Sequence, residues 1–144
     1  MNANFQYQGA GQRIQKDLLN GWYAALEAAP DRGEKVAYLF ISGNIGELLQ
    51  ACGFHLVYPE VNALQCGIKK VAGPNILAAE DIGYSGDVCG YVKNDIGLML
   101  GGNKMPHGTA LPPPDLLVCN YAGCATYLRW FEALADMLAI VWTN

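Results

Sequence analysis

Two of the five cysteines stand directly before a predicted helix, a position where a thiol can do chemistry. Cys124 follows the apolar run 116–118, and a helical pattern begins at the next residue. Cys89 follows Gly86-Asp87-Val88 and precedes a second helical pattern over 90–100. The N-terminal end of a helix favours a thiolate over a thiol. The alternative is that both cysteines are small buried hydrophobes, as free cysteines often are.

The two cysteines lie 35 residues apart, and we expect them to meet at one face of a sheet. Thiolates far apart in sequence are typical ligands of iron–sulfur clusters, although this spacing has no Cys-x-x-Cys pair. Structural zinc needs four ligands, and His55 and His107 are poor candidates for the remaining places. We expect Cys52 and Cys66 to be packing residues, while both packing and ligation stay open for Cys119.

Ser42 and Glu60 each follow an apolar run, at 36–41 and 54–58. Carboxyl ends of parallel strands share one edge, so both residues are expected near the cysteines. A glutamate there can act as a proton donor or base. The alternative, which the sequence by itself favours, is that Ser42 caps a helix and Glu60 begins one.

Strands and helices are predicted to alternate along the chain. Helices are expected at 12–28, 45–52, 61–71, 90–100 and after 124, with a short helical turn at 76–79; strands are expected at 36–41, 54–58, 116–120 and 139–144. This order predicts an α/β fold with an open, mainly parallel, Rossmann-like sheet flanked by helices. We expect an N-terminal arm and helix over 1–33 and an α/β domain over 34–144. A final strand with no helix after it is an abrupt finish for this fold. We therefore expect the chain to be the first part of a longer protein.

The composition excludes several classes of protein. A net charge of −4, with basic residues scattered along the 144-residue chain, argues against a nucleic-acid surface. The sequence contains no run of 18 apolar residues, so we expect no membrane span. The odd number of cysteines and the lack of a secretory signal predict a cytoplasmic protein. A hydrophobic fraction of 52% indicates a large core or apolar surface that a partner covers.

Five segments occur in an order that resembles a known family. They are Glu47-Leu-Leu-Gln-Ala-Cys-Gly, Pro59-Glu-Val-Asn-Ala-Leu-Gln, Asp87-Val-Cys-Gly-Tyr-Val-Lys-Asn-Asp-Ile-Gly, Pro114-Asp-Leu-Leu-Val and Tyr121-Ala-Gly-Cys-Ala-Thr-Tyr-Leu-Arg-Trp-Phe-Glu. Together they resemble the benzoyl-CoA reductase / 2-hydroxyacyl-CoA dehydratase family, from about residue 34 to the end. The match is closest to the B-type subunits of its ATP-dependent benzoyl-CoA reductase branch.

The resemblance implies a [4Fe-4S] cluster held by three cysteines of a subunit. Cys89 and Cys124 match the first two ligands, and the third belongs to a later part of the family's chain that this sequence lacks. Ser42 and Glu60 fall near the places of a serine and a glutamate that handle substrate in the dehydratase branch. Asn120 and Tyr121 are expected beside the cluster, where hydrogen bonds set its potential.

The function implied by the resemblance is ATP-driven reduction of the aromatic ring of benzoyl-CoA to a cyclohexadienoyl-CoA, in anaerobic aromatic degradation. The implied partners are a homologous cluster-binding subunit, an ATP-hydrolysing iron–sulfur activator and an acyl-CoA substrate. One alternative is a subunit of a 2-hydroxyacyl-CoA dehydratase. Another is a non-catalytic α/β interaction module, favoured by the apolar composition and the missing third ligand.

Overall fold

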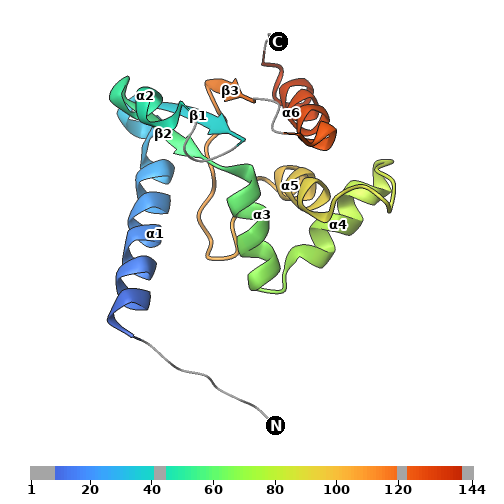
Figure 1. The fold of residues 1–144 in the computed structure, drawn as a ribbon, viewed down its shortest axis with the longest axis horizontal. Coiled ribbons are helices and arrows are strands. Elements are labelled where there is room, and N and C mark those ends of the chain that lie inside the picture. The colour runs from blue at the N-terminus through green and yellow to red at the C-terminus, as the bar shows by residue number, and fades with distance from the viewer. Residues whose placement is uncertain (1–8, 41–44, 120–122, 141–144) are drawn as a thin grey trace.

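A three-stranded parallel sheet lies at the centre of the fold (Figure 1). The computed structural model describes residues 9–40, 45–119 and 123–140. The strands β1 (Lys35–Leu39), β2 (Phe54–Val57) and β3 (Leu116–Val118) are ordered β2-β1-β3. Ala37 of β1 is in register with Leu56 on one side and with Leu116 on the other. The chain is therefore an α/β protein with an open parallel sheet, as predicted.

Helices connect and flank the strands. Their bounds are α1 (Ala10–Ala28), a short 3₁₀ turn η1 (Pro30–Arg32), α2 (Gly46–Ala51), α3 (Pro59–Ile68), α4 (Ala72–Asp81), α5 (Gly90–Leu100) and α6 (Ala125–Leu138). The helices α3 and α5 pack against each other, and α4 packs along α5. An irregular segment over 101–115, rich in Gly and Pro, then leads from α5 back into β3.

The central strand β1 is buried on both faces, which explains its continuous apolar sequence. Side chains alternate across a strand, so Val36, Tyr38 and Phe40 enter the larger core with Ile96, Phe131 and other residues of the flanking helices. Ala37 and Leu39 enter a smaller core on the other face. The start of α3, which follows the carboxyl end of β2, is therefore anchored by the paired strands β1 and β2.

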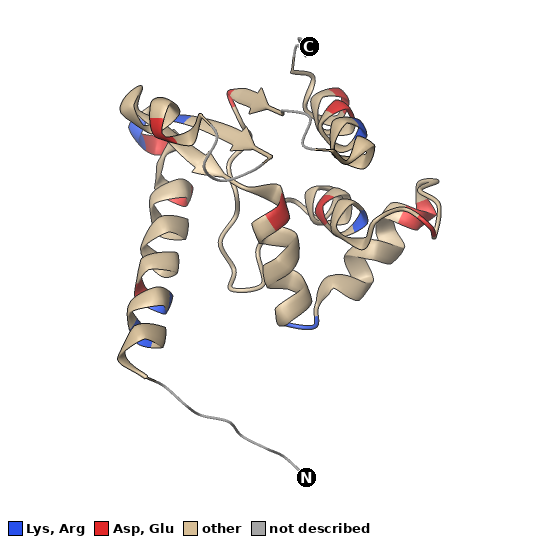
Figure 2. Cartoon of the chain, in the orientation of Figure 1, with Lys and Arg blue, Asp and Glu red and all other residues tan. Residues whose placement is uncertain are grey.

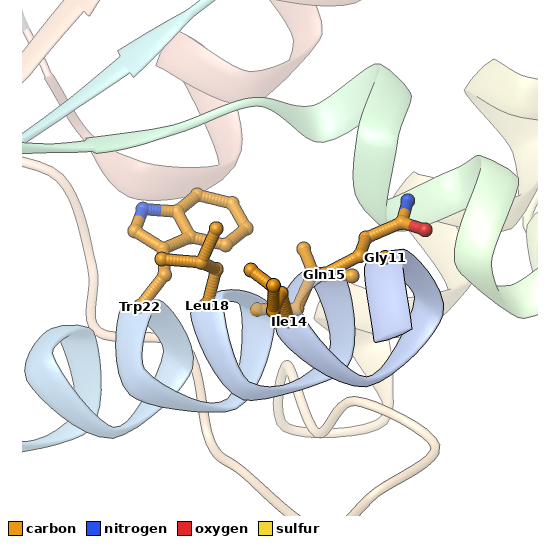
Figure 3. Close-up of a pocket in the computed structure, with 6 residues that line it drawn as sticks. Gly11, Ile14, Gln15, Leu18 and Trp22 are labelled. Atoms are coloured by element: carbon orange, nitrogen blue, oxygen red, sulfur yellow. The ribbon is translucent and has the colours of Figure 1, made fainter. Parts of the chain in front are cut away.

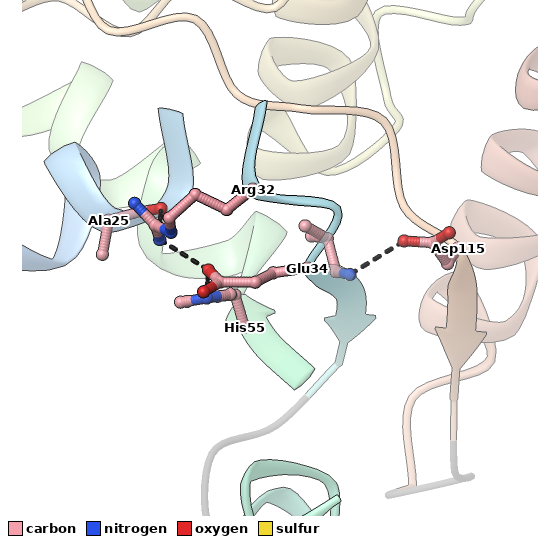
Figure 4. A network of polar contacts seen from close by, with 6 residues as sticks. Ala25, Arg32, Glu34, His55 and Asp115 are labelled. Atoms are coloured by element: carbon pink, nitrogen blue, oxygen red, sulfur yellow. Dashed lines mark hydrogen bonds and ion pairs between the residues drawn. The ribbon is translucent and has the colours of Figure 1, made fainter. Parts of the chain in front are cut away.

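Polar contacts fix the opposite, amino end of the sheet (Figure 4). Glu34 Oε2 lies 2.6 Å from both an Arg32 guanidinium nitrogen and Nε2 of His55. Asp115 accepts a 2.9 Å hydrogen bond from the backbone N–H of Val36 and pairs with the ammonium of Lys35 at 2.7 Å. These contacts align the strands, and His55 is half-buried and paired with Glu34.

Two predicted features differ in the structure. The expected short turn at 76–79 is the ten-residue helix α4, because Pro74 lies in its first turn, where a missing N–H costs nothing. Ala139 and Ile140 are not part of a strand, and the rest of the strand expected there lies outside the described residues.

The helix α1 reaches away from the sheet at its N-terminal end (Figure 1). Its C-terminal half is held by Leu26, which is fully buried, and by a 3.0 Å hydrogen bond from Nε1 of Trp22 to the Leu56 carbonyl. Further toward the N-terminus, Ile14 and Leu18 are exposed. No helix in the described part of the chain is long and apolar enough to span a membrane.

Candidate functional site

Cys124 is the residue from which α6 starts, six residues after the end of β3. Its side chain is half-buried. Interactions of the sulfur with the Thr126 side chain, and then with the backbone N–H groups of Thr126 and Tyr127, hold its pKa below the ordinary value. This is the thiolate-favouring setting of a helix N-terminus that the sequence predicted.

Cys89 is the corresponding residue at the start of α5. It is exposed, and its backbone carbonyl accepts the first helical hydrogen bond, from the N–H of Lys93 at 3.2 Å. The chain reaches it through the segment 82–89 after α4, and not directly from a strand. Both cysteines therefore lie at helix N-termini as predicted. Cys124 comes after a strand, whereas Cys89 comes after a helix.

Tyr127, in the first turn of α6, connects the groups of this site. Its hydroxyl donates a 3.4 Å hydrogen bond to Oε1 of Glu60, and its ring packs on Phe40 with 3.5 Å between centroids. Burial, followed by the negative charges of Glu60 and Cys124 and more weakly that of Cys89, raises the Tyr127 pKa. The Tyr127 hydroxyl is therefore bonded to Glu60 and lies within the electrostatic influence of both thiols.

Glu60 lies in the first turn of α3, directly after β2 (Figure 2). Pro59 occupies the first helical position, where its fixed φ suits a helix start. The carboxylate is half-buried, and the Tyr127 hydroxyl is its hydrogen-bond donor. Phe40 follows β1, Glu60 lies in α3 after β2, and Tyr127 lies in α6. The three side chains meet at one corner of the sheet.

Three predicted site residues, Ser42, Asn120 and Tyr121, lie outside the described residues. They remain predictions.

The other cysteines have different surroundings. Cys66 is fully buried in α3, where burial raises its pKa, as expected for a packing residue. Cys52 is exposed at the end of α2, so the expectation that it packs is wrong, because the short helix buries only the side of Gly46 and Leu49. Burial and then Glu132 raise the pKa of Cys119, whose Sγ approaches the backbone carbonyl of Tyr127 at 3.9 Å. Cys89 and Cys124 thus differ from the other cysteines by their position at helix starts, and Cys124 also by its lowered pKa.

The donor set at this corner suits thiolate-ligated iron in part. Within residues 9–40, 45–119 and 123–140, no group of three His, Cys, Asp or Glu side chains is close enough to hold a metal ion. The iron atoms of iron–sulfur clusters bind thiolates, and the thiols of Cys89 and Cys124 have this chemistry. The described residues therefore include two thiols at helix starts, and no complete ligand set for a metal ion.

A hollow of about 330 Å³ lies between the starts of α5 and α6. Its walls are mainly apolar, from Tyr84, Val88, Val92 and Trp130, and Thr126 and Arg129 add polar groups. Thr126 also interacts with the Cys124 sulfur, so the hollow adjoins the thiol. Apolar walls with few polar groups are typical of sites for small organic ligands.

The sequence did not reveal the polar interior of α5. Lys93, Asn94 and Asp95 are each less than 5% exposed, although they are among the most hydrophilic residues of the helix. Tyr91 and Leu100 of the same helix are apolar, yet they are 38% and 46% exposed. Consecutive polar residues within an apolar segment were the available signal, but their partners come from other elements.

Comparisons with known proteins agree with the resemblance. The family model "2-hydroxyglutaryl-CoA dehydratase, D-component" matches residues 46–143. The chain is 44% identical over 120 residues to the B-type subunit of the benzoyl-CoA reductase of Thauera aromatica, covering 83% of this chain and 28% of that protein. It is 33% identical over 116 residues to the (R)-phenyllactyl-CoA dehydratase alpha subunit of Clostridium sporogenes, covering 81% of this chain and 28% of that protein. The chain thus spans less than a third of the length of these relatives.

Proposed function

Since the chain belongs to the 2-hydroxyglutaryl-CoA dehydratase D-component family, we propose that it is the cluster-binding part of a benzoyl-CoA reductase subunit. The proposed reaction of the whole protein is the ATP-driven reduction of benzoyl-CoA to a cyclohexadienoyl-CoA. Its 44% identity to a benzoyl-CoA reductase subunit supports this choice within the family. The proposed partners are a homologous cluster-binding subunit and an ATP-hydrolysing iron–sulfur activator.

The observation that carries the proposal is the pair of thiols at the starts of α5 and α6. Both act on the Tyr127 hydroxyl, and both are accessible from solvent at least in part. We propose that Cys89 and Cys124 hold a [4Fe-4S] cluster, with its remaining protein ligand outside these 144 residues. The cluster supplies one-electron transfer at low potential when it is bound.

The chain's own residues have separate tasks in this proposal. The Tyr127 hydroxyl holds the Glu60 carboxylate in place, so that Glu60 can accept or donate a proton beside the thiols. The rings of Phe40, Tyr127 and Trp130 pack beside one another and exclude water from this corner. Ser42, Asn120 and Tyr121 stay proposed members of the site, as substrate and hydrogen-bonding residues.

A 2-hydroxyacyl-CoA dehydratase is the second candidate. The matching family model carries a dehydratase name, and the phenyllactyl-CoA enzyme subunit is 33% identical. In that case the same thiols and Glu60 would serve the removal of water from a 2-hydroxyacyl-CoA.

Product analysis separates the two candidates. The full subunit, its partner subunit and an activator are incubated anaerobically with ATP and either benzoyl-CoA or a 2-hydroxyacyl-CoA. We expect a dienoyl-CoA from benzoyl-CoA, and activity lost in Cys89→Ala and Cys124→Ala. An enoyl-CoA formed from the 2-hydroxy substrate, with benzoyl-CoA unchanged, would support the dehydratase instead.

A thiol-bound cluster needs a reducing compartment, so we also propose a cytoplasmic location. All five cysteines are free thiols in the structure, which agrees with this proposal.

A further inference from the structure

We propose that α5 sets the separation of the two cysteines, with Asp95 and Lys93 as positioning residues. The purpose of this arrangement rests on the proposed function, since it assumes that Cys89 and Cys124 bind one group. Its geometry rests only on contacts among described residues.

Asp95 connects the two helices that begin with the cysteines. Its Oδ2 accepts a 2.8 Å hydrogen bond from Nε1 of Trp130 on α6, and the two residues are 2% and 1% exposed. Asp95 comes six residues after Cys89, and Trp130 comes six residues after Cys124. At 1.5 Å per residue, the hydrogen bond therefore joins the helices about 9 Å along each axis from its cysteine. The hydrogen bond therefore ties the two helices at equal offsets from their cysteines.

Lys93 fixes the segment that carries Cys89. Its ammonium donates a 2.8 Å hydrogen bond to the Gly86 carbonyl and a 2.6 Å hydrogen bond to Oε1 of Glu80 on α4. The side chain is only 5% exposed, so these bonds are largely shielded from water. The residues just before Cys89 are thus tied to the same helix that Asp95 ties to α6.

The chemistry of the buried Asp95–Trp130 pair favours a role in positioning α6 against α5 over a role in stabilising the fold. Burying a carboxyl group costs free energy, and an apolar pair of the same volume often stabilises a fold better than a polar pair. A single directional hydrogen bond, however, selects one rotation of α6 against α5. Trp130 Nε1 is a donor only, so it requires an acceptor at position 95.

The test measures the cysteine separation without any cluster. Nitroxide spin labels are attached to Cys89 and Cys124 in the full 144-residue chain, with Cys52 and Cys119 changed to Ser and the buried Cys66 left in place. Dipolar broadening in the electron paramagnetic resonance spectrum then reports the distribution of distances between the labels. Far-UV circular dichroism of every variant reports whether it folds.

Three variants separate positioning from stability. Asp95→Asn keeps an acceptor for the indole and should leave the distance distribution unchanged. The double variant Asp95→Leu/Trp130→Phe replaces the hydrogen bond by an apolar pair, so it should fold at least as stably yet lose the narrow distribution. Lys93→Met should increase the mobility of a label on Cys89 and leave a label on Cys124 unchanged.

A narrow, unshifted distribution in the folded double variant would overturn the proposal. The result is independent of the proposed function, which is tested by iron content of Cys89→Ala and Cys124→Ala in unlabelled protein. If iron binding fails while the distance responds as expected, the positioning contacts stand and the role of the thiols is wrong.

Discussion

The helices α5 and α1 use polar and apolar side chains in opposite ways. On α5, Lys93, Asn94 and Asp95 are buried to between 1% and 4% exposure. On α1, Ile14 and Leu18 are 60% and 70% exposed, and they line a shallow apolar hollow along the helix (Figure 3). These three polar side chains of α5 lie inside the molecule, whereas Ile14 and Leu18 of α1 lie outside.

The difference shows where the fold is most tightly specified. Buried polar groups are costly unless they find partners, and each of the three on α5 reaches another element: Glu80 and Asn75 on α4, and Trp130 on α6. Nδ2 of Asn94 has no partner among the described residues, so the arrangement is not free of cost. The outer half of α1 instead leaves large apolar side chains in solvent. The proposed site is built on α5 and not on α1.

The largest effect should come from Gly97, where α5 meets α4. A side chain at this position would overlap the backbone carbonyl of Asn75, which cannot move without displacing α4. We expect Gly97→Ala to lower the free energy of unfolding by about 3 kcal/mol or more. Gly21→Ala on α1, where nothing lies within 4 Å of the added carbon, is the matched control. In urea denaturation, Gly21→Ala should be as stable as the wild type or more stable by up to about 1 kcal/mol. Equal losses of stability in both variants would refute the difference between α5 and α1.

Asp95 should make stability fall as the pH rises. Burial raises its pKa from 3.8 to about 7, although the Trp130 hydrogen bond opposes this. The folded state therefore binds the proton more tightly than the unfolded state, and the stabilisation is complete below about pH 4 and lost as the pH rises toward 7. The change should amount to a few kcal/mol, and Asp95→Asn should remove it. Tyr38 and Cys66 lie near this charge, but burial raises the pKa of both, so they stay neutral in this range. Identical pH profiles for wild type and Asp95→Asn would contradict the assignment.

Tyr127→Phe should have a smaller and more specific effect. It removes the hydroxyl that donates to Glu60 and keeps the ring that packs on Phe40. A single such hydrogen bond contributes about 1 kcal/mol, so kcat of the assembled enzyme should fall about fivefold, and the free energy of unfolding should fall by no more than about 1 kcal/mol. Tyr84→Phe, in the wall of the adjoining hollow, is a control that leaves Glu60 untouched. An equal loss in the control would assign the effect to general packing.

The smallest effect should come from the exposed face of α1. Ile14→Ser and Leu18→Ser should change the free energy of unfolding by no more than about 0.5 kcal/mol, because both side chains already contact water. Leu26→Ala in the same helix should cost about 3 kcal/mol, since this side chain is fully buried. Thermal denaturation of the three variants tests the difference, and a large loss from Ile14→Ser would mean that the outer half of α1 is part of the core.

Local sequence patterns predict the fold where local physics decides it. The apolar run at 36–41 includes all of β1 except Lys35, and residue spacing alone places Cys89 and Cys124 at helix starts. The helix α4 is longer than predicted because Gly73-Pro74 is typical of a break, while proline is equally compatible with a first helical turn.

Tertiary contacts determine what the sequence could not show. Tyr127 belongs to the apolar face of its helix by spacing, but its hydroxyl meets Glu60, 67 residues earlier in the chain. Asp95 and Lys93 have charged side chains at interior positions, and only the folded chain brings Trp130 and Glu80 to them. Their burial follows from partners that no local pattern encodes.

The most direct test of the proposed site is anaerobic iron and sulfide analysis, with an electronic spectrum. The preparations are the 144-residue chain alone, the same chain with its partner subunit, and the full-length subunit. We predict a cluster that is lost on changing either Cys89 or Cys124 to Ala and retained in Cys52→Ala, whose thiol is also exposed but lies at the end of α2. Iron content that is the same in all three variants, or absent from every preparation including the full-length subunit, would contradict the assignment of these two thiols as cluster ligands.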